Sequence, residues 1–527
     1  MSIAILWVAL ASSIAVFAQT GSDADRLVRE GRELARQGRL EEAEATLRQG
    51  RTQHPNDARF ALELAGVRYL RKDLTGARQS LHAALRLEPQ NAYGNEFLGS
   101  LYLMDGNLPA ALRYWNRMGQ PVVGAVLFVP ALPLDPVMLA RLPGVSAGQV
   151  LTEDRLARTA ASLRSLGISA DSRFRLDARA DRRYNFTIQT EPLERTGGRW
   201  WWQALPYLRS LPYEAVNVDF FNIGKKATHF TSLWRWDAEK RRIASELSGQ
   251  ASGTIRYRLA LDARDERWDL RRTYNGEAAA LDGVELRSVA GGGEAIVPLG
   301  VTTRWTSGLF VSGRQYRNIG NEAGAWSSGG WLAEMRNRLE GRVAFWPEQR
   351  LRVDGWASLR SGRFLSGAGG KRFVSPSGGL QAQWFPQARG ERYEVNLQTR
   401  AGGAYGRVPL DEMFLLGMER DNPLWLRGHV GTRSGRKGNA PLGSQFFLVN
   451  ADVQRELWRV LFLRVQAGPF FDVGATRDPG GSFGSRGLIY DTGLQVTLHT
   501  MRGIRISAVY GRDLRNGRPA IYTAVSR

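Results

Sequence analysis

Leu426-Arg427-Gly428-His429 and, further along, Phe470-Phe471-Asp472-Val473-Gly474 frame an alternating, strand-like stretch of the 527-residue chain. Their spacing predicts a loop arginine and a strand aspartate that meet inside a closed barrel. An unpaired guanidinium in a lumen walled by protein is poorly solvated, so a carboxylate that offers bidentate hydrogen bonds is its natural partner. We therefore expect Arg427 and Asp472 to pair and to hold a long loop in place.

The C-terminal part of the chain, residues 196–527, is a succession of short alternating segments joined by turns rich in glycine, proline or charge. In 254–261, 393–399 and 504–510, apolar residues alternate with polar or charged ones. A period of two gives each strand one apolar face and one wet face. A soluble β-sandwich with a dry interior and a membrane barrel with a polar lumen both satisfy this pattern.

The aromatic content favours the barrel. The chain has 59 glycines, 16 tryptophans and 15 tyrosines, which suits short strands with aromatic residues at a membrane interface. Tryptophans near the expected strand ends are Trp200, Trp201, Trp202, Trp234, Trp236, Trp305 and Trp331. A spanning strand needs about 9 to 11 residues, so this region has room for sixteen strands with their connections. The sequence predicts an antiparallel transmembrane β-barrel.

The formal charge of +21 comes from 72 basic and 51 acidic residues. Because both signs are interspersed along the whole chain, without a recognisable nucleic-acid module, we expect no nucleic-acid partner. A solvated arginine-rich surface or attraction to anionic headgroups of the outer-membrane lipid accounts for the charge. The chain has no cysteine, which excludes thiolate nucleophiles and zinc–thiolate sites.

The motifs do not favour catalysis. The histidines never fall at a metal-ligand spacing; they are His54, His82, His229, His429 and His499. No G-x-S-x-G elbow and no histidine beside a serine–aspartate pair occurs in a recognisable motif. We expect neither enzymatic activity nor a metal or other cofactor.

Residues 1–18 contain an apolar stretch that ends in Val16-Phe17-Ala18. Its short length and small final residue predict a secretory signal peptide cleaved after Ala18. No lysine or arginine precedes the apolar run, which leaves a retained anchor as the alternative. No later segment is a continuous apolar run long enough for a spanning helix.

Between residues 24 and 118, within an expected domain at 19–119, the chain repeats itself at a period of 34. The aligned small residues are Gly31, Ala65 and Gly99 in one set and Ala43, Ala77 and Ala111 in the other, and the aligned large ones are Leu47, Leu81 and Trp115. Small residues let paired helices approach closely, and large ones fill the groove of the next repeat. The pattern resembles the tetratricopeptide repeat and predicts an N-terminal α-solenoid, which either binds a peptide or protein partner or acts as a spacer.

Residues 120–195 predict a small α+β domain. A strand over 126–129 and a short helix over 136–142 precede a helix that starts at Glu153 and ends at Gly167, and two strands follow over 173–180 and 184–191. This second part resembles the closing half of a POTRA domain, a small periplasmic domain that carries polypeptides to an outer-membrane barrel. The resemblance implies strand addition at a sheet edge.

Further motifs accompany the opening pair in a fixed order: 409–417 (PLDEMFLLG), 441–443 (PLG) and Asn450-x-Asp452. Together they resemble the outer-membrane insertase and translocase superfamily, the BamA- and TamA-like barrels of the bacterial surface antigen family. The resemblance implies sixteen strands and a long extracellular loop that folds back into the lumen, where Arg427 meets Asp472.

The resemblance also assigns roles around this pair. Gly428 removes a side chain where the loop turns tightly, and Gly474 lets the chain pass close to the lumen wall. The other motif residues are Leu426, His429, Phe470, Asn450 and Asp452. His429 replaces the family's aromatic residue, so it could stack or titrate.

The leading functional hypothesis is an outer-membrane polypeptide transporter or insertase with its N-terminal domains in the periplasm. Its repeats would recruit a client polypeptide or a periplasmic partner protein, and the arginine–aspartate pair would lock the loop in the lumen. The alternative is a passive porin or surface-binding barrel with a periplasmic scaffold domain.

Overall fold

The computed structural model describes residues 23–140, 142, 144–193, 210–270, 281–318, 329–366, 371–460, 463–478, 483–485, 487–500 and 503–526. The predicted signal peptide and the tryptophans at 200–202 lie outside these ranges. The chain forms two compact units, one built mainly from residues before 126 and one from most of the chain after it. Among the helices of the described ranges, none combines the length and the apolar character needed to cross a membrane.

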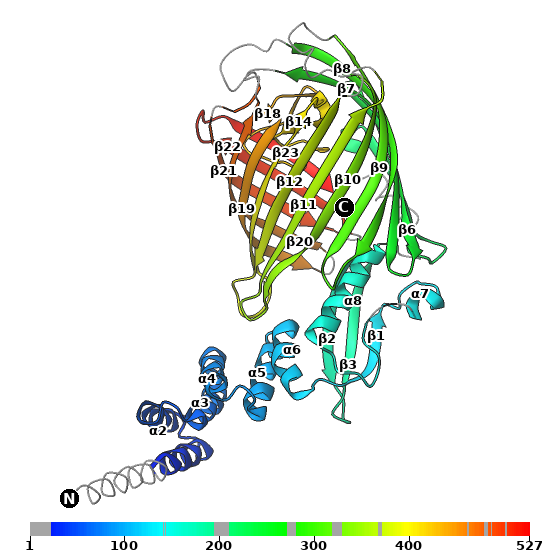
Figure 1. The fold of residues 1–527 in the computed structure, drawn as a ribbon. Coiled ribbons are helices and arrows are strands. Elements are labelled where there is room, and N and C mark those ends of the chain that lie inside the picture. The colour runs from blue at the N-terminus through cyan, green and yellow to red at the C-terminus, as the bar shows by residue number, and fades with distance from the viewer. Residues whose placement is uncertain are drawn as a thin grey trace, which may run out of the picture. The chain divides into compact units, whose positions relative to one another are not determined.

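The first unit contains the helical repeats (Figure 1). Its helices are 23–36, α2 (Leu40–Gln53), α3 (Ala58–Leu70), α4 (Leu74–Leu87), α5 (Ala92–Met104), α6 (Leu108–Trp115) and the short η1 (Asn116–Met118). Four helices begin after a capping side chain that accepts a hydrogen bond from the first turn, and the caps are Asp57, Asp73, Asn91 and Asn107. Each cap satisfies a backbone N–H that would otherwise lack a partner, which fixes where the helix starts.

The aligned small residues of the repeats lie where two helices touch. A Cβ atom on Gly31 would lie 2.6 Å from the Leu47 side chain, and one on Gly99 would lie 2.4 Å from Trp115. The four aligned alanines are all fully buried, and they are Ala43, Ala65, Ala77 and Ala111. Small and large residues therefore interlock between paired helices.

A three-stranded sheet follows in the chain, in the order β1 (Val123–Val129), β3 (Tyr184–Pro192), β2 (Ser169–Ala178). Its connecting helices are α7 (Pro136–Ala140) and α8 (Glu153–Leu166). Helix α8 buries Leu156, Leu163 and Leu166, and it ends at Gly167, whose φ of +63° is typical of a helix C-terminus. The sequence predicted all five elements, but their observed ends differ from the expected ones by up to four residues; β2, for example, covers 169–178 and not 173–180.

The second unit contains a β-barrel whose wall is one antiparallel sheet (Figure 1). Its long strands are β4 (Ala215–Ile223), β5 (Thr228–Asp237), β6 (Lys240–Ser252), β7 (Ile255–Leu270), β8 (Leu281–Pro298), β9 (Arg304–Arg317), β10 (Gly330–Trp346), β11 (Leu351–Phe364), β12 (Arg372–Trp384), β13 (Tyr393–Gly403), β19 (Gln445–Val460), β20 (Leu463–Arg477), β21 (Ile489–His499), β22 (Arg505–Asp513) and β23 (Pro519–Ser526).

The barrel sheet includes eighteen strands, and three of them, β14, β16 and β17, are two-residue pieces. Fifteen long strands therefore lie within the described residues. The expectation of sixteen stays a prediction, because residues 194–209 precede β4 and lie outside the described ranges.

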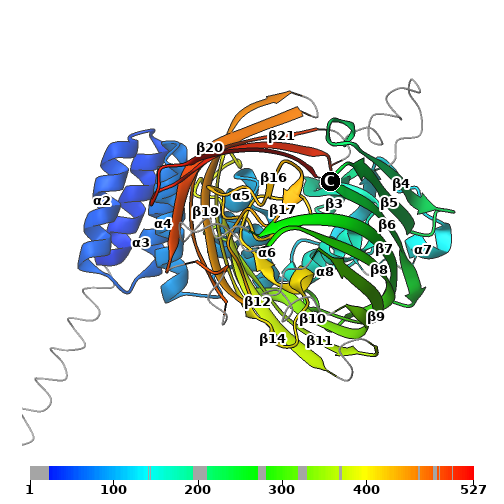
Figure 2. The ribbon, with the colours of Figure 1, turned by 90° about the horizontal axis from the view of Figure 1, so that it is seen from above.

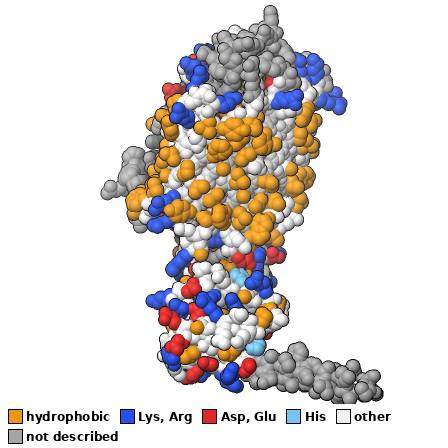
Figure 3. All heavy atoms as spheres, turned by 90° about the vertical axis from the view of Figure 1, so that its left-hand side faces the viewer, with side chains coloured by type: hydrophobic (Ala, Val, Ile, Leu, Met, Phe, Trp, Pro, Cys, Tyr) orange, Lys and Arg blue, Asp and Glu red, His pale blue; other side chains and the backbone are white. Residues whose placement is uncertain are grey.

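Large apolar side chains on the wall point outward and are exposed (Figure 3). They include Leu261, Leu309, Val343, Leu380, Leu397, Leu494 and Ile521. The predicted interface tryptophans at 234, 236, 305 and 331 are between 40% and 54% exposed. A wrapped sheet with an apolar outer belt excludes the soluble sandwich, whose apolar faces would be buried against each other.

The sheet curls round so that β23 lies next to β4 in strand order, which closes the barrel (Figure 2). Within the described residues, continuous registers connect neighbouring long strands from β4 round to β23, for example β4 with β5 and β22 with β23. A hydrogen bond of 2.9 Å from the Tyr213 hydroxyl to Thr523 links β23 to the short helix η2 (Leu211–Tyr213) before β4. We call this place the seam.

Residues 404–444, between β13 and β19, form a loop that lies inside the barrel (Figure 2). We call this segment the lumen loop. Its short elements are β14 (Tyr405–Gly406), η4 (Leu410–Glu412), β15 (Phe414–Leu415), β16 (Thr432–Arg433), β17 (Arg436–Lys437) and β18 (Leu442–Gly443).

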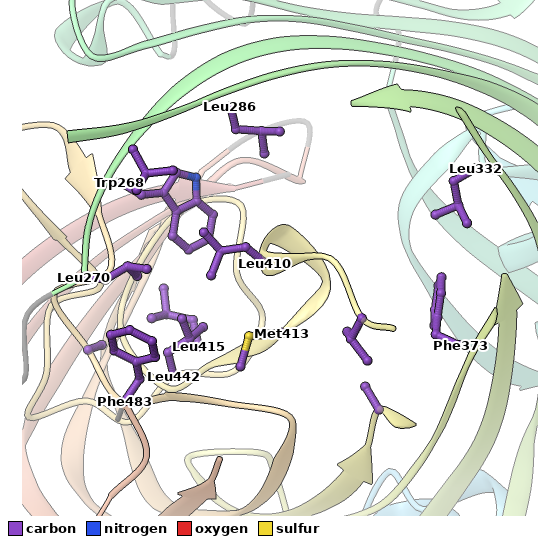
Figure 4. Close-up of a cluster of buried hydrophobic side chains, with 14 of the residues drawn as sticks. Trp268, Leu270, Leu286, Leu332, Phe373, Leu410, Met413, Leu415, Leu442 and Phe483 are labelled. Atoms are coloured by element: carbon purple, nitrogen blue, oxygen red, sulfur yellow. The ribbon is translucent and has the colours of Figure 1, made fainter. Parts of the chain in front are cut away.

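An apolar core holds the lumen loop against the wall (Figure 4). Loop residues Leu410, Met413 and Leu415 belong to one buried cluster with wall residues that include Trp268 and Phe373. Strand β17 also pairs with the wall strand β7, with Lys437 opposite Trp268. Part of the barrel interior is thus a packed protein core.

Candidate functional site

The guanidinium of Arg427, in the lumen loop, meets the carboxylate of Asp472, on β20. Arg427 Nη2 lies 2.6 Å from Asp472 Oδ1, and Arg427 Nε donates to Oδ2 at 2.9 Å. The backbone N–H of Arg427 donates to the same Oδ2 at 2.9 Å. Arg427 is 4% exposed and Asp472 is fully buried. This is a bidentate, charge-assisted contact with a third hydrogen bond, a geometry that lysine cannot reproduce.

Other wall groups complete the surroundings of the guanidinium. Arg427 Nη1 donates to Asp452 on β19 at 2.8 Å and to Gln495 on β21 at 3.1 Å. The ring of Phe470 lies 4.0 Å from the guanidinium carbon, which places the cation over the aromatic face. Burial lowers the pKa of Arg427, but the hydrogen bond and charge of Asp472 outweigh burial and raise it. The cation is thus held in its charged form.

Three glycines let the loop backbone approach the wall. A Cβ atom on Gly428 would lie 2.5 Å from the Asp491 carboxylate, and the Gly428 N–H donates to that carboxylate at 2.5 Å. A Cβ atom on Gly474 would press on Leu426 at 3.2 Å. On β22, a Cβ atom on Gly511 would lie 1.8 Å from the backbone oxygen of Arg427. The motifs include the first two glycines, whereas Gly511 resembles any other strand glycine in the sequence.

His429 lies between two wall carboxylates. Its Nδ1 is 3.0 Å from Asp491 Oδ2 on β21, and its Nε2 is 3.3 Å from Asp513 Oδ2 on β22. All three residues are buried. Neutral imidazole donates from only one nitrogen, so two facing carboxylates favour the doubly protonated ring. Burial lowers the pKa of His429, but the two aspartates outweigh burial and raise it above the ordinary value.

His429, Asp491 and Asp513 also form a group of ligand atoms within 4.8 Å of one another, of the kind that can hold a metal ion. The carboxylates face opposite nitrogens of the ring, an arrangement that suits a doubly protonated ring with one N–H toward each carboxylate better than one ion bound by all three groups. Sequence spacing missed this group because its members come from the lumen loop and two wall strands. Of the two expected behaviours of His429, the geometry favours titration.

The remaining motif residues support the turn. Leu426 is fully buried in a cluster with Leu416 and Leu448. Asn450 donates to the backbone oxygen of Trp425 at 2.8 Å. Arg400 on β13 contacts Asn450 and donates to the Pro423 oxygen at 2.6 Å.

A second anchor, which the sequence did not indicate, lies against β6 and β7. Lys240 on β6 contacts Glu419 of the lumen loop at 2.9 Å, and loop residue Lys437 lies 3.2 Å from Glu266 on β7. Asp421 of the loop contacts Lys240 and, at 2.7 Å, Arg242. Lys240, Glu266, Glu419 and Lys437 are buried. Unlike charges therefore alternate between loop and wall in a place with little solvent.

A third anchor involves the start of the lumen loop. Arg314 on β9 contacts Asp411 at 3.0 Å and Glu412 at 2.5 Å. Tyr316 donates to Asp411 at 2.6 Å, and Arg360 on β11 lies 2.5 Å from Glu412. Burial raises the pKa of Glu412, but the charges of Arg360 and Arg314 outweigh burial and lower it. The motif at 409–417 includes both acids, but their partners on β9 and β11 have no sequence signature.

The three anchors connect the lumen loop to well-separated parts of the wall. The first uses β19 to β22, the second β6 and β7, and the third β9 and β11. Removing one partner from a buried ion pair costs about 3–5 kcal/mol, because the other charge stays buried without compensation. The arrangement can therefore hold the loop firmly, and release requires several buried contacts to separate.

Comparisons with known proteins agree with parts of this description. A family model described as the tetratricopeptide repeat matches residues 28–92 and 75–120, which confirms the predicted repeats. No curated protein sequence matches the chain.

The solved structures to which the chain is similar include those of BamA and CdiB. One is BamA from Haemophilus ducreyi lacking POTRA domains 1–3, at 10% identity and a TM-score of 0.43, with 77% of this chain and 84% of that chain covered. Another is CdiB from Escherichia coli, at 13% identity and 0.49, covering 77% and 76%. CdiB from Acinetobacter baumannii has 11% identity and a TM-score of 0.45, covering 88% and 86%. BamA is among the barrels that the sequence motifs resemble.

Proposed function

We propose that this chain is an outer-membrane polypeptide transporter or insertase in which the lumen loop is a releasable lock. The observation that carries the proposal is the buried, bidentate contact between Arg427 and Asp472. A passive porin needs an open, water-filled lumen. Here the loop fills part of the lumen with an apolar cluster and three sets of charged contacts. Such extensive contacts suit a channel that is closed at rest.

The outer belt supports a location in the outer membrane. Exposed leucine, valine and isoleucine side chains on the wall match a lipid-facing surface, while charged residues point to the lumen. A barrel satisfies the backbone hydrogen bonds of its strands without water, which a lipid environment requires. In this arrangement the N-terminal domains are periplasmic, and lipid is a constant partner.

The seam supports insertion or delivery of an incoming strand. Strand β4 has 9 residues, the lower limit of the 9 to 11 or so that span a bilayer, and β23 has 8, just below it. Short strands share fewer backbone hydrogen bonds, so they open more easily than the long ladders elsewhere in the wall. An opened seam presents unpaired backbone groups on which a client strand can form hydrogen bonds. That pairing would shield the client backbone from lipid.

The N-terminal elements suit client recruitment. The tetratricopeptide repeats offer a curved helical surface for a peptide or partner protein. The sheet of β1, β3 and β2 has two edge strands, and we interpret it as a POTRA-like domain that receives a client by strand addition. Client binding at these domains would precede release of the lumen loop.

Substituting Arg427→Ala tests the lock. We expect the variant to show more open-channel conductance in planar bilayers and altered delivery of client to the outer membrane. Arg433→Ala is the matched control, because Arg433 is an exposed arginine of the same loop. Unchanged behaviour of Arg427→Ala in both assays would contradict the lock.

A deletion of residues 24–118 tests the transport function separately. We expect the outer membrane to lose one protein or a small set of proteins when its proteome is compared with wild type. Steady conductance of the wild-type chain, together with an unchanged proteome after the deletion, would favour the passive porin or surface-binding barrel instead.

A further inference from the structure

Helix α7 exposes apolar side chains next to the barrel. It consists of five apolar residues, Pro-Val-Met-Leu-Ala, of which Val137 and Leu139 are 55% and 39% exposed. Residues 126–144, which include this helix, belong to the same compact unit as the barrel. Apolar side chains that gather on a surface indicate a contact with an apolar partner.

The local sequence determines where α7 begins and which part of it is fixed. Asp135 precedes Pro136, and the Asp135 carboxylate accepts a hydrogen bond from the Val137 N–H at 2.8 Å. An aspartate cap followed by proline at the first helical position is a favourable helix start. Leu134, just before the cap, is buried. The start of the helix is therefore held by the unit, while Val137 and Leu139 stay on its surface.

Two hydrogen bonds attach the start of α7 to the turn between β4 and β5. The Asp135 N–H donates to the backbone oxygen of Lys225 at 2.9 Å, and the Asn222 side chain donates to the Pro133 oxygen at 2.6 Å. The side-chain oxygen of Asn222 also accepts from the Ala227 N–H at 3.0 Å. Asn222 thus connects the two ends of the turn to the segment that leads into α7.

His229, on β5, fixes the same turn to helix α8. Its Nδ1 accepts a hydrogen bond from the Asn222 N–H at 3.2 Å, so its Nε2 carries the proton and donates to the Leu166 oxygen at 2.6 Å. Asn222 and His229 are both buried. Because buried hydrogen bonds hold the turn on two sides, α7 cannot leave the end of the wall without breaking them.

The apolar surface of α7 continues the outer belt of the wall. Seen along the barrel, α7 lies outside the ring of strands (Figure 2). Phe220 on β4 is on the outer face, because Ala215, five residues earlier, pairs with Arg235, which reaches Asp421 in the lumen. Phe220 and Ile223, the last residue of β4, are 47% and 46% exposed. The partner that covers this belt therefore also reaches α7.

Two exposed lysines, Lys225 and Lys226, occupy the turn that α7 contacts. Lysine beside an exposed apolar helix is typical of a surface that lies on a bilayer, where the ammonium group is attracted to anionic headgroups. The acid of this segment, Asp135, has one oxygen engaged by the Val137 N–H. The combination of apolar side chains with a basic edge favours a lipid surface over an apolar groove of another protein.

We propose that α7 and the β4–β5 turn form a membrane anchor that lies in the periplasmic leaflet of the outer membrane. The anchor consists of Val137, Leu139, Ile223, Lys225 and Lys226. The inference rests on the proposed function, because it requires the barrel to be in that membrane. The apolar side chains enter the boundary between headgroups and acyl chains, and the lysines contact lipid phosphates. In this position the anchor holds the strand β4, at the seam, against the bilayer.

The test uses the absence of cysteine from the chain, which lets one introduced cysteine carry a nitroxide label. The full-length protein is placed in nanodiscs of phosphatidylglycerol and phosphatidylethanolamine, and electron paramagnetic resonance measures label accessibility to oxygen, which concentrates in lipid, and to a water-soluble nickel complex. Leu261→Cys is the lipid reference and Leu70→Cys, on α3, is the water reference, since these side chains are 67% and 57% exposed. We expect the oxygen-to-nickel ratio of Leu139→Cys to exceed that of Leu70→Cys several-fold and to approach that of Leu261→Cys.

A second pair of variants tests the lysines. Lys225→Gln/Lys226→Gln should lower the ratio at the Leu139 label in this anionic lipid and should have less effect in phosphatidylcholine. Arg182→Gln/Arg183→Gln is the matched control, because both arginines are exposed in the turn between β2 and β3. An equal ratio in wild type and in the lysine variant would overturn the role of the lysines in the anchor.

The references separate failure of the anchor from failure of the proposed function. If the Leu139 label resembles the Leu70 label while the Leu261 label stays in lipid, the anchor is wrong and the barrel remains in the membrane. A Leu139 label protected from both reagents would assign α7 to a protein contact and would also overturn the anchor. A Leu261 label in water would contradict the membrane location and the anchor with it.

Discussion

The indole of Trp425, in the lumen loop, packs edge-on against the ring of Tyr522 on β23, with ring centroids 5.6 Å apart. The indole N–H donates to two loop carbonyls, those of Glu419 and Asn422, so the ring is fixed within the loop. Arg420 of the same loop lies 3.2 Å from the ring centroid of Tyr213, on the other side of the seam. The lumen loop therefore touches both sides of the seam, and we expect its release to loosen the seam.

Trp425→Ala should loosen the seam. The change removes an aromatic pair that contributes about 0.5–1.5 kcal/mol beyond its buried area and leaves Tyr522 without its neighbour. We expect faster hydrogen exchange in the backbone amides of β23, with little change in β10 and β11. Trp458→Ala is the control, because Trp458 is 49% exposed on the outer wall. Equal exchange in the two variants would show that the loop does not support the seam.

The contribution of His429 to holding the lumen loop in the closed barrel should weaken as the pH rises. The aspartates raise the pKa of His429 in the locked state above the ordinary value of about 6.5. Stabilisation by the imidazolium is therefore complete below about pH 6.5 and is lost as the pH rises through the higher, locked-state pKa. We expect open-channel conductance to increase over that interval.

His429→Phe should remove this pH dependence, because phenylalanine fills similar space without titrating. The groups that face the ring are Asp491 on β21 and Asp513 on β22, and Arg515 lies 3.8 Å from Asp513. If the pH profile of the wild type matches that of His429→Phe, a charged His429 between the two aspartates does not stabilise the closed loop. Stoichiometric zinc in the purified wild type, absent from Asp513→Asn, would assign the group to a metal instead.

The second anchor should act together with the first. Glu266→Gln removes the negative charge between Lys240 and Lys437, at a cost of about 3–5 kcal/mol for a disrupted buried pair. Because other anchors remain, we expect brief channel openings from this change or from Arg427→Ala alone. The double variant should stay open for long periods in planar bilayers.

Asp265→Asn provides the control for the second anchor. Asp265 is next to Glu266 on β7 but pairs with Arg287 on the outer face, where both side chains are at least 40% exposed. Combining Asp265→Asn with Arg427→Ala should add nothing to the single Arg427 variant. If the openings of Glu266→Gln/Arg427→Ala last no longer than those of Arg427→Ala, the two anchors do not act together to hold the lumen loop.

The sequence predicted those contacts whose members belong to compact motifs. Arg427 and Asp472 lie in short, recognisable runs, and the structure places them in contact. Asp491 and Asp513 occupy ordinary polar positions of alternating strands, so the pattern does not distinguish them from other lumen residues. Their contact with His429 depends on strand register and on the path of the lumen loop.

The buried ion pairs of the second anchor are likewise contacts that the sequence pattern does not predict. Lys240, Glu266 and Lys437 lie on three segments that the closed wall and the folded loop bring together. Charged residues on strands predict a wet face, and solvent would satisfy them without any partner. These positions become a dry, paired network only when the barrel closes and the loop folds into it. The alternation of residues along the strands therefore predicted the barrel but not the ion pairs of its anchors.

Gly99→Ala should destabilise the helical repeats, whereas Gly66→Ala should not. A methyl group at Gly99 would lie 2.4 Å from Trp115 and force the helices apart, at a cost of about 1–3 kcal/mol. Gly66, inside α3, has open space around the same position, and alanine there should stabilise the helix by about 0.5–1 kcal/mol. Thermal unfolding of the full-length protein, followed by the helical circular dichroism signal, should shift in opposite directions for the two variants. Equal shifts would mean that helix propensity, rather than the contact of Gly99 with Trp115, determines the stability of the solenoid.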